Sequence, residues 1–140
     1  MAYSWKNSVF KTALQAEDAF YSAFNDHDID AMMSVWDAAG DIVCVHPGGI
    51  RLEQWKAIEE SWTAIFSAEG SVNLYTDAVI HFASETLNVH HVKEHISVGG
   101  TFHGTVLAVN VYRKTDSGWK MISHHASGEP PSPSSRTDLH

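Results

Sequence analysis

The most constraining feature of this chain is a segment near its C-terminus, from Gly118 to Ser127. A tryptophan follows a Thr-Asp-Ser-Gly turn, apolar and polar residues then alternate, and the paired histidines His124 and His125 come near the end. This pattern predicts a final β-strand that carries polar side chains into an apolar interior. An earlier apolar segment, Val43 to Val45, also ends on a histidine, His46. Two strand-borne histidines so far apart in sequence meet only if a folded sheet brings them together.

Size and charge limit the classes of function. A chain of 140 residues predicts one domain with a genuine core. The net charge of -8 argues against nucleic acid and acidic membranes as partners. No apolar run approaches the roughly 20 residues of a membrane span, and the N-terminus has no apolar signal core, so we expect a cytoplasmic protein. The single cysteine, Cys44, lies in an apolar run, and we expect it to be buried and structural.

The first half of the chain predicts helices. Apolar residues at helical spacing indicate an amphipathic helix from about Trp5 to Asn25. A short second helix is predicted to begin at Asp28, as N-cap, and to stop at Gly40. A strand from Asp41 to Val45 and a third helix from about Leu52 to Ser67 follow.

The second half predicts strands joined by hairpin-length turns, which imply antiparallel neighbours. The expected strands run from Val72 to Ala83, Leu87 to Val98, Thr101 to Lys114 and Trp119 to Ser127. We therefore predict an α+β fold in which N-terminal helices pack on one face of a curved, mostly antiparallel sheet. Residues 1–128 are expected to form one domain, and the Pro/Ser-rich residues 129–140 a disordered tail.

Side-chain alternation predicts which polar groups face the helices. Glu94 shares a face with Val92 and Ile96, so its carboxylate is expected inside. In the last strand Lys120 prefers solvent, which predicts His124 outside. The residues then expected to point inward are Trp119, Met121, Ser123, His125 and Ser127.

The preceding strand is apolar on both faces. Because Arg113 prefers solvent, Ala108, Asn110 and Tyr112 are expected to point inward. The opposite face carries Leu107, Val109 and Val111. A strand covered on both faces is typical of a sheet whose outer face forms a dimer interface.

These motifs resemble the nuclear transport factor 2-like superfamily. The resemblance rests on three helices before a curved sheet, on His-Pro-Gly-Gly after the first strand and on Gly-Trp-Lys-Met-Ile-Ser-His-His-Ala-Ser in the last. The SnoaL-like subgroup is the most similar, and residues 119–130 also resemble the end of the calcium/calmodulin-dependent protein kinase II association domain. Spanning about Val9 to Ser127, the resemblance implies a cystatin-like cone roll, as in ketosteroid isomerases and polyketide cyclases. It specifies the fold better than the function, because this superfamily contains enzymes, ligand binders and oligomerisation modules.

The resemblance further implies a funnel between helices and sheet, and a homodimer through the outer face of the sheet. Funnel-lining positions in relatives match His46, Glu94, Asn110 and His125, and the expected walls are Trp36, Trp62 and Tyr112. The chain lacks clear counterparts of the ketosteroid isomerase Asp base and Tyr-Asp pair, and of the Asp-Arg-Asp set of limonene epoxide hydrolases. The kinase association domain has a pocket arginine where this chain has Asn110. The chemistry of those relatives therefore does not carry over directly.

Structural interpretations stay open for several of these residues. His46 either hydrogen-bonds the following turn or enters the pocket, and the stripe of Trp55 and Trp62 is typical of core packing. The histidines His90, His91 and His95 fit a solvated or interface face better than a metal site.

Glu94 also has two interpretations. A buried carboxylate costs several kcal/mol unless it is paired or protonated. A partner such as His46 or His125 would satisfy it structurally, and the same pair would also supply an acid with a raised pKa or a histidine base.

Three classes of function follow. The first is a SnoaL-like protein that binds a small, largely apolar molecule in the funnel and catalyses proton transfer, with Glu94 and His125 or His46 as acid and base. Such an enzyme would be a cofactor-independent isomerase, cyclase or hydrolase-like lyase. The alternatives are a non-catalytic ligand-binding module and an oligomerisation module. A variant places a metal between His46, Glu94 and His125, although neither metal nor cofactor is the main expectation.

Overall fold

The computed structural model describes residues 9–130. Two helices, α1 (Ala13–Asp26) and α2 (Ile29–Val35), precede the short strand β1 (Val43–Val45) and helix α3 (Trp55–Ser67). Four long strands follow, namely β2 (Val72–Ala83), β3 (Leu87–Val98), β4 (Thr101–Thr115) and β5 (Gly118–Gly128).

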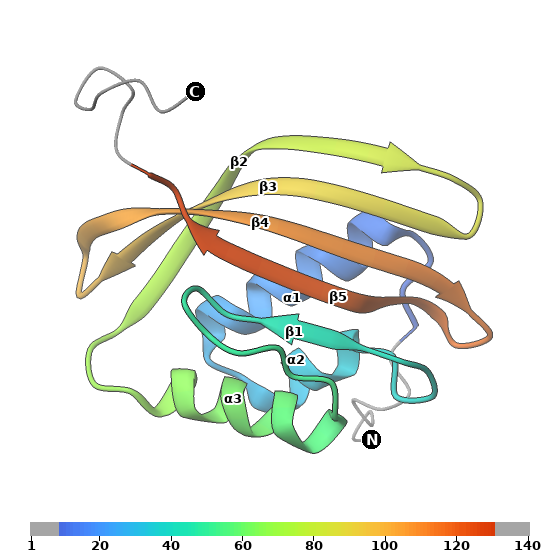
Figure 1. Ribbon diagram of the computed structural model, residues 1–140, viewed down its shortest axis with the longest axis horizontal. Coiled ribbons are helices and arrows are strands. Elements are labelled where there is room, and N and C mark those ends of the chain that lie inside the picture. The colour runs from blue at the N-terminus through green and yellow to red at the C-terminus, as the bar shows by residue number, and fades with distance from the viewer. Residues whose placement is uncertain (1–8, 131–140) are drawn as a thin grey trace.

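The strands form one five-stranded sheet in the order β1-β5-β4-β3-β2. Strand β1 runs parallel to β5, and every other pairing is antiparallel. The sheet curls without closing, and the helices lie against one of its sides (Figure 1). The predicted α+β, cystatin-like fold is confirmed. No helix within residues 9–130 has the length and apolar character needed to cross a membrane.

Helix α1 begins later than the sequence pattern predicted. Its N-cap is Thr12, whose backbone is extended and whose side chain accepts a hydrogen bond from the Gln15 backbone N–H. The helix therefore starts at Ala13, and residues 9–12 are not helical. The part of the expected helix between Trp5 and residue 8 lies outside the described residues.

Helix α2 has the predicted start and an earlier end. The Asp28 side chain accepts a hydrogen bond from the Ala31 backbone N–H, which confirms the N-cap. The helix does not continue to Gly40, because Trp36 has an extended backbone and forms an isolated bridge to Met121 of β5. This bridge fixes the helical layer to the sheet.

The other boundaries lie within a few residues of those expected. Strands β2 and β3 have the predicted bounds, and β4 and β5 are slightly longer. Helix α3 begins at Trp55 instead of Leu52, and β1 begins at Val43 instead of Asp41. The disordered tail was expected at residues 129–140, and residues 131–140 of it lie outside the described residues.

A bulge in β5 changes the orientation of the C-terminal histidines. Tyr112 of β4 pairs with Met121, but the preceding residue, Val111, pairs with Ser123. Ile122 is therefore an extra residue on β5, and a single inserted residue reverses the alternation that follows.

Beyond the bulge, inward and outward positions are exchanged. His124 and Ala126 are buried against the helices, whereas His125 and Ser127 are exposed on the outer face. The predictions that His125 points inward and His124 outward were therefore wrong. Before the bulge, Trp119 and Met121 are buried as expected. The expectation that Lys120 faces solvent was wrong, because Lys120 is also buried and its Nζ donates a hydrogen bond to the Ser34 carbonyl.

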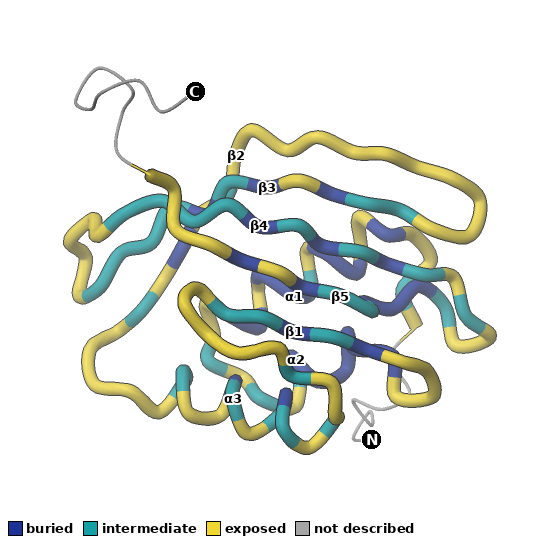
Figure 2. Tube along the Cα trace, in the orientation of Figure 1, coloured by how far each residue is buried: buried dark blue, intermediate teal, exposed yellow. Residues whose placement is uncertain are grey.

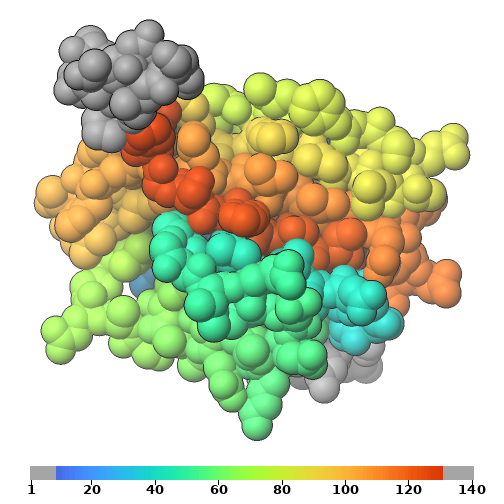
Figure 3. Space-filling view, viewed as in Figure 1, coloured from blue at the N-terminus to red at the C-terminus, as the bar shows by residue number. Residues whose placement is uncertain are grey.

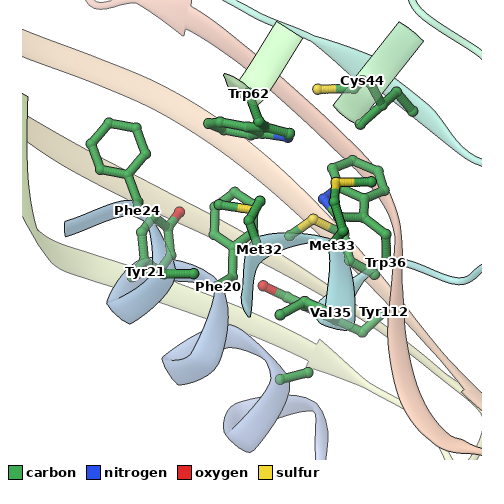
Figure 4. Packing of buried hydrophobic residues seen from close by; sticks show 14 of the residues in the cluster. Phe20, Tyr21, Phe24, Met32, Met33, Val35, Trp36, Cys44, Trp62 and Tyr112 are labelled. Carbon is green, nitrogen blue, oxygen red and sulfur yellow. The ribbon is translucent and has the colours of Figure 1, made fainter. Parts of the chain in front are cut away.

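The core lies between the three helices and the inner face of the sheet. Trp62 of α3 faces Phe20 and Met32 across this layer, while Trp36 lies toward the other end (Figure 4). Trp36 and Trp62 are both almost completely buried. Figure 2 shows β2 as a largely exposed edge strand beside the half-buried β3 and β4. In Figure 3 the segment that follows β1 lies directly against β5.

Candidate functional site

Seven polar side chains meet between α1 and the inner face of the sheet. We call them the interior network: Glu17, Tyr21, His90, Glu94, Asn110, Tyr112 and His124. All are buried, and hydrogen bonds connect all of them. Burial of so many polar groups is tolerable because each finds a partner.

Glu94 of β3 forms one end of the network. It is 5% exposed, as the alternation of β3 predicted, and its Oε2 accepts a hydrogen bond of 2.7 Å from the Tyr21 hydroxyl. Burial raises the pKa of Glu94 to about 7, the Tyr21 hydrogen bond opposes this rise, and the nearby charge of Glu17 adds to it. The prediction that His46 or His125 is the partner of Glu94 was wrong, because the hydrogen-bond partner of Glu94 is Tyr21.

Asn110 of β4 joins the two halves of the network. Its Nδ2 donates to the Tyr21 hydroxyl over 2.8 Å and to Glu17 Oε2 over 3.4 Å. Its Oδ1 lies 2.6 Å from His124 Nδ1. An amide oxygen only accepts, so His124 Nδ1 carries the proton and Nε2 is the ring's acceptor.

His124 is held in its neutral form. Burial lowers its pKa to about 3, and the neighbouring His46 and His125 contribute to the lowering. The ring packs between Phe20 and Trp62, with centroid separations of 5.1 and 5.8 Å. A neutral imidazole with one free lone pair is therefore present in an aromatic environment at pH 7.

Glu17 of α1 forms the other end of the network. Its Oε2 accepts a hydrogen bond of 3.1 Å from the Tyr112 hydroxyl and lies 2.9 Å from His90 Nδ1. Three donors thus converge on one oxygen of a carboxylate that is 6% exposed.

His46 lies beside the network without joining it. Its Nε2 is 2.9 Å from Ser61 Oγ, and its ring meets Trp62 edge-on with centroids 4.7 Å apart. The Ser61 hydroxyl donates to the Ile58 carbonyl, so His46 Nε2 donates to Ser61. Burial lowers the pKa of His46. Its ring centroid is 6.4 Å from that of His124, which makes His46 a neighbour of the site.

Two expected site residues lie elsewhere. His125 faces the outer side of the sheet, where it borders a hollow of about 530 Å³ with Ile80 and Val109. Trp36 borders a separate cavity of about 770 Å³ beside Asp37, between the end of α2 and the β4–β5 turn. The structure therefore brings together Glu94, Asn110 and Tyr112, places Trp62 and His46 beside them, and separates His125 and Trp36.

Sequence reasoning missed Glu17, Tyr21, His90 and His124. A signal for the first two was present, because Glu17 and Tyr21 are four residues apart and share the apolar face of α1 with Ala13 and Phe24. A carboxylate and a phenol on such a face are expected to need buried partners.

A curled, unclosed sheet covered by helices on one face is the arrangement of the NTF2-like class of α+β proteins. Within that class the chain belongs to the SnoaL-like domain family, which matches residues 13–132.

Solved structures agree with this assignment. A protein from Thiobacillus denitrificans, provisionally assigned as a calcium/calmodulin-dependent protein kinase type II association domain, is 35% identical with a TM-score of 0.82, covering 88% of this chain and 99% of its own. A provisionally assigned dehydratase of the NTF2-like family from Streptomyces avermitilis is 29% identical with a TM-score of 0.75, covering 83% and 92%. An NTF2-like protein of unknown function from Pseudomonas putida shares the fold at 20% identity and a TM-score of 0.72, covering 90% and 89%.

One curated relative comes from a plant. F-box protein SKIP8 of Arabidopsis thaliana is 22% identical over 125 residues, which cover 88% of this chain. The chain spans about half the length of that relative, 53%.

Proposed function

We propose that this SnoaL-like protein binds a small, largely apolar molecule beside the interior network and that Glu94 moves a proton to or from it. The observation that carries the proposal is the buried Glu94 carboxyl with a pKa of about 7, positioned by Tyr21. A group with a pKa near the working pH is populated in both its acid and base forms, as general acid–base catalysis requires.

The surroundings of Glu94 support this role. Asn110 fixes the Tyr21 hydroxyl, so the phenol has one orientation in which it donates to the carboxylate. The neutral His124 ring in the same interior offers Nε2 as a hydrogen-bond acceptor to the bound molecule, and we propose this role for it in place of the proton transfer expected of His125. His46, next to Trp62, would contact the bound molecule without transferring the proton.

The reaction class follows from these groups. An enclosed, partly aromatic interior that holds a carboxyl with a pKa near neutrality suits isomerisation, cyclisation or loss of water next to a carbonyl group. These reactions need no cofactor, because the proposed proton carrier is the Glu94 side chain. The provisional dehydratase assignment of the Streptomyces avermitilis protein is consistent with this class. A cytoplasmic location, expected from the sequence, stays a prediction.

A minimal substrate tests the proposal. Cyclohex-3-enone is small and apolar, and its conversion to the conjugated cyclohex-2-enone moves one proton from C2 to C4. We expect the wild-type chain to accelerate this conversion, followed by ultraviolet absorbance, and Glu94→Gln to lose about 100-fold or more of the acceleration. Glu85→Gln, at an exposed position in the β2–β3 turn, is the matched control and should retain the wild-type rate. Equal rates for wild type and Glu94→Gln would contradict the assignment of Glu94 as the proton carrier.

A second candidate function is an oligomerisation module. The similarity to the provisionally assigned kinase association domain favours it, as does the outer sheet face with Leu107, Val109 and Val111. Both functions can coexist, because the interior network and the outer face lie on opposite sides of the sheet.

A further inference from the structure

At the end of the interior network away from Glu94, three metal-ligating side chains come together. Glu17 of α1, His81 of β2 and His90 of β3 each have one ligand atom within 4.8 Å of the other two. His81 and His90 are directly opposite each other in the β2–β3 register, with ring centroids 4.1 Å apart. We propose that these three residues bind one divalent transition-metal ion of the zinc class.

The chemistry of the donors selects the ion. Two imidazoles and one carboxylate suit Zn²⁺ and its first-row neighbours, whereas Ca²⁺ and Mg²⁺ prefer oxygen ligands alone. Three protein ligands leave a position for water on a tetrahedral ion. The site therefore resembles open zinc sites more closely than closed four-ligand structural sites.

Neighbouring side chains hold the Glu17 carboxylate in one orientation. Its Oε2 accepts hydrogen bonds from Tyr112 and Asn110, which fix the plane of the carboxylate. Partners of this kind orient metal ligands in proteins. Within residues 9–130 no lysine or arginine is found in an ion pair with Glu17. A bound cation would place positive charge directly beside this buried carboxylate.

The three candidate ligands differ in exposure. His81 is exposed, whereas Glu17 and His90 are buried. Strand β2, which carries His81, is an edge strand of the sheet and is largely exposed (Figure 2). An ion that approaches this edge of the sheet would therefore meet His81 first. Bound there, it would link α1 to the two strands of the β2–β3 hairpin.

A simpler arrangement uses the same contacts without an ion. In that case His90 and Glu17 form a buried hydrogen-bonded pair, and His81 only packs on the His90 ring. The two alternatives differ in the effect of His81. As a ligand it sets the metal affinity, whereas as a packing residue it has no influence on metal binding.

Calorimetric titration of the untagged full-length chain with zinc chloride at neutral pH separates them. We expect one Zn²⁺ per chain, and an affinity at least about tenfold lower in His81→Ala, because even loss of an outer-shell partner weakens metal binding ten- to a hundredfold. His103→Ala removes another exposed histidine, outside the cluster, and should bind Zn²⁺ like the wild type. His81 is exposed, so its truncation should leave the fold intact, which circular dichroism will verify.

Three results would overturn the site: no Zn²⁺ bound by the wild type, equal affinity in wild type and His81→Ala, or equal losses in His81→Ala and His103→Ala. The inference does not depend on the proposed function. Glu94→Gln should keep the wild-type Zn²⁺ affinity, because Glu94 is outside the metal cluster. Failure of the isomerisation assay and failure of zinc binding are thus separate results.

Discussion

The Tyr21 hydroxyl donates a hydrogen bond of 2.7 Å to Glu94 Oε2, and this contact joins helix α1 to strand β3 of the sheet. Burial raises the pKa of Tyr21 well above its usual value, and the charge of Glu94 raises it further. The phenol therefore keeps its proton throughout the physiological range. Glu94, with a pKa of about 7, is the partner that titrates.

Removal of the Tyr21 hydroxyl tests this relationship. Tyr21→Phe deprives Glu94 of its donor and Asn110 of one acceptor, so we expect a loss of about 1–3 kcal/mol in the free energy of unfolding. The pKa of Glu94 should rise further, because the lost hydrogen bond favours the ionised form. Urea denaturation and carboxyl ¹³C NMR measure the two effects. Tyr75→Phe, at an exposed tyrosine, is the control, and equal effects of the two substitutions would contradict the assignment.

Glu94 makes stability depend on pH. Its pKa is about 7 in the folded chain and 4.5 in the reference state, so between these values the folded chain holds a proton that the unfolded chain has released. Stability contributed by the protonated group is thus fully present below about pH 4.5 and is lost as the pH rises through about 7. The shift corresponds to about 3 kcal/mol.

Glu94→Gln should remove this contribution, because Gln keeps the shape without the charge. We expect the variant and the wild type to have similar stability near pH 5, and the variant to be more stable at pH 8 by up to about 3 kcal/mol. The difference between the two urea curves across pH isolates Glu94 from the histidines. The difference in the free energy of unfolding between wild type and the exposed control Glu85→Gln should not vary with pH. A flat difference for Glu94→Gln would show that Glu94 does not titrate in this window.

The regular parts of the fold and three of the seven network residues, Glu94, Asn110 and Tyr112, were accessible to sequence reasoning. Strand β3 alternates without interruption up to Glu94, so its inward orientation follows from its apolar neighbours on the same face. The histidines of β5 were assigned to the wrong faces because counting alternate residues assumes a strand without an inserted residue. Nothing in the side chain of Ile122 indicates the bulge. The Tyr21–Glu94 pair joins residues that are 73 positions apart, and no local pattern specifies such a contact.

His124 should remain neutral where ordinary histidines titrate. Its burial lowers the pKa to about 3, so ring NMR signals should stay constant between pH 5 and 8 and show a proton on Nδ1, which donates to Asn110. His124→Gln identifies the resonances. Below pH 6.5 His124 binds a proton in the unfolded chain but stays unprotonated in the folded chain. The free energy of unfolding therefore decreases as the pH falls from 6.5 toward 3. A sigmoidal shift centred near pH 6.5 would contradict a buried neutral ring.

The outer face of the sheet is the proposed dimer interface. Leu107, Val109 and Val111 are half-buried on this face, and Ile80 beside them is 57% exposed. An apolar face of this kind favours association between two copies of the chain. Sedimentation at micromolar concentration should give about twice the chain mass of 15.5 kDa. Val109→Lys places a charge at the centre of the face and should give the monomer mass, whereas Thr63→Lys, on the exposed side of α3, should remain dimeric. A wild-type chain that stays monomeric on concentration, or a Val109→Lys variant that still dimerises, would place the interface elsewhere or exclude it.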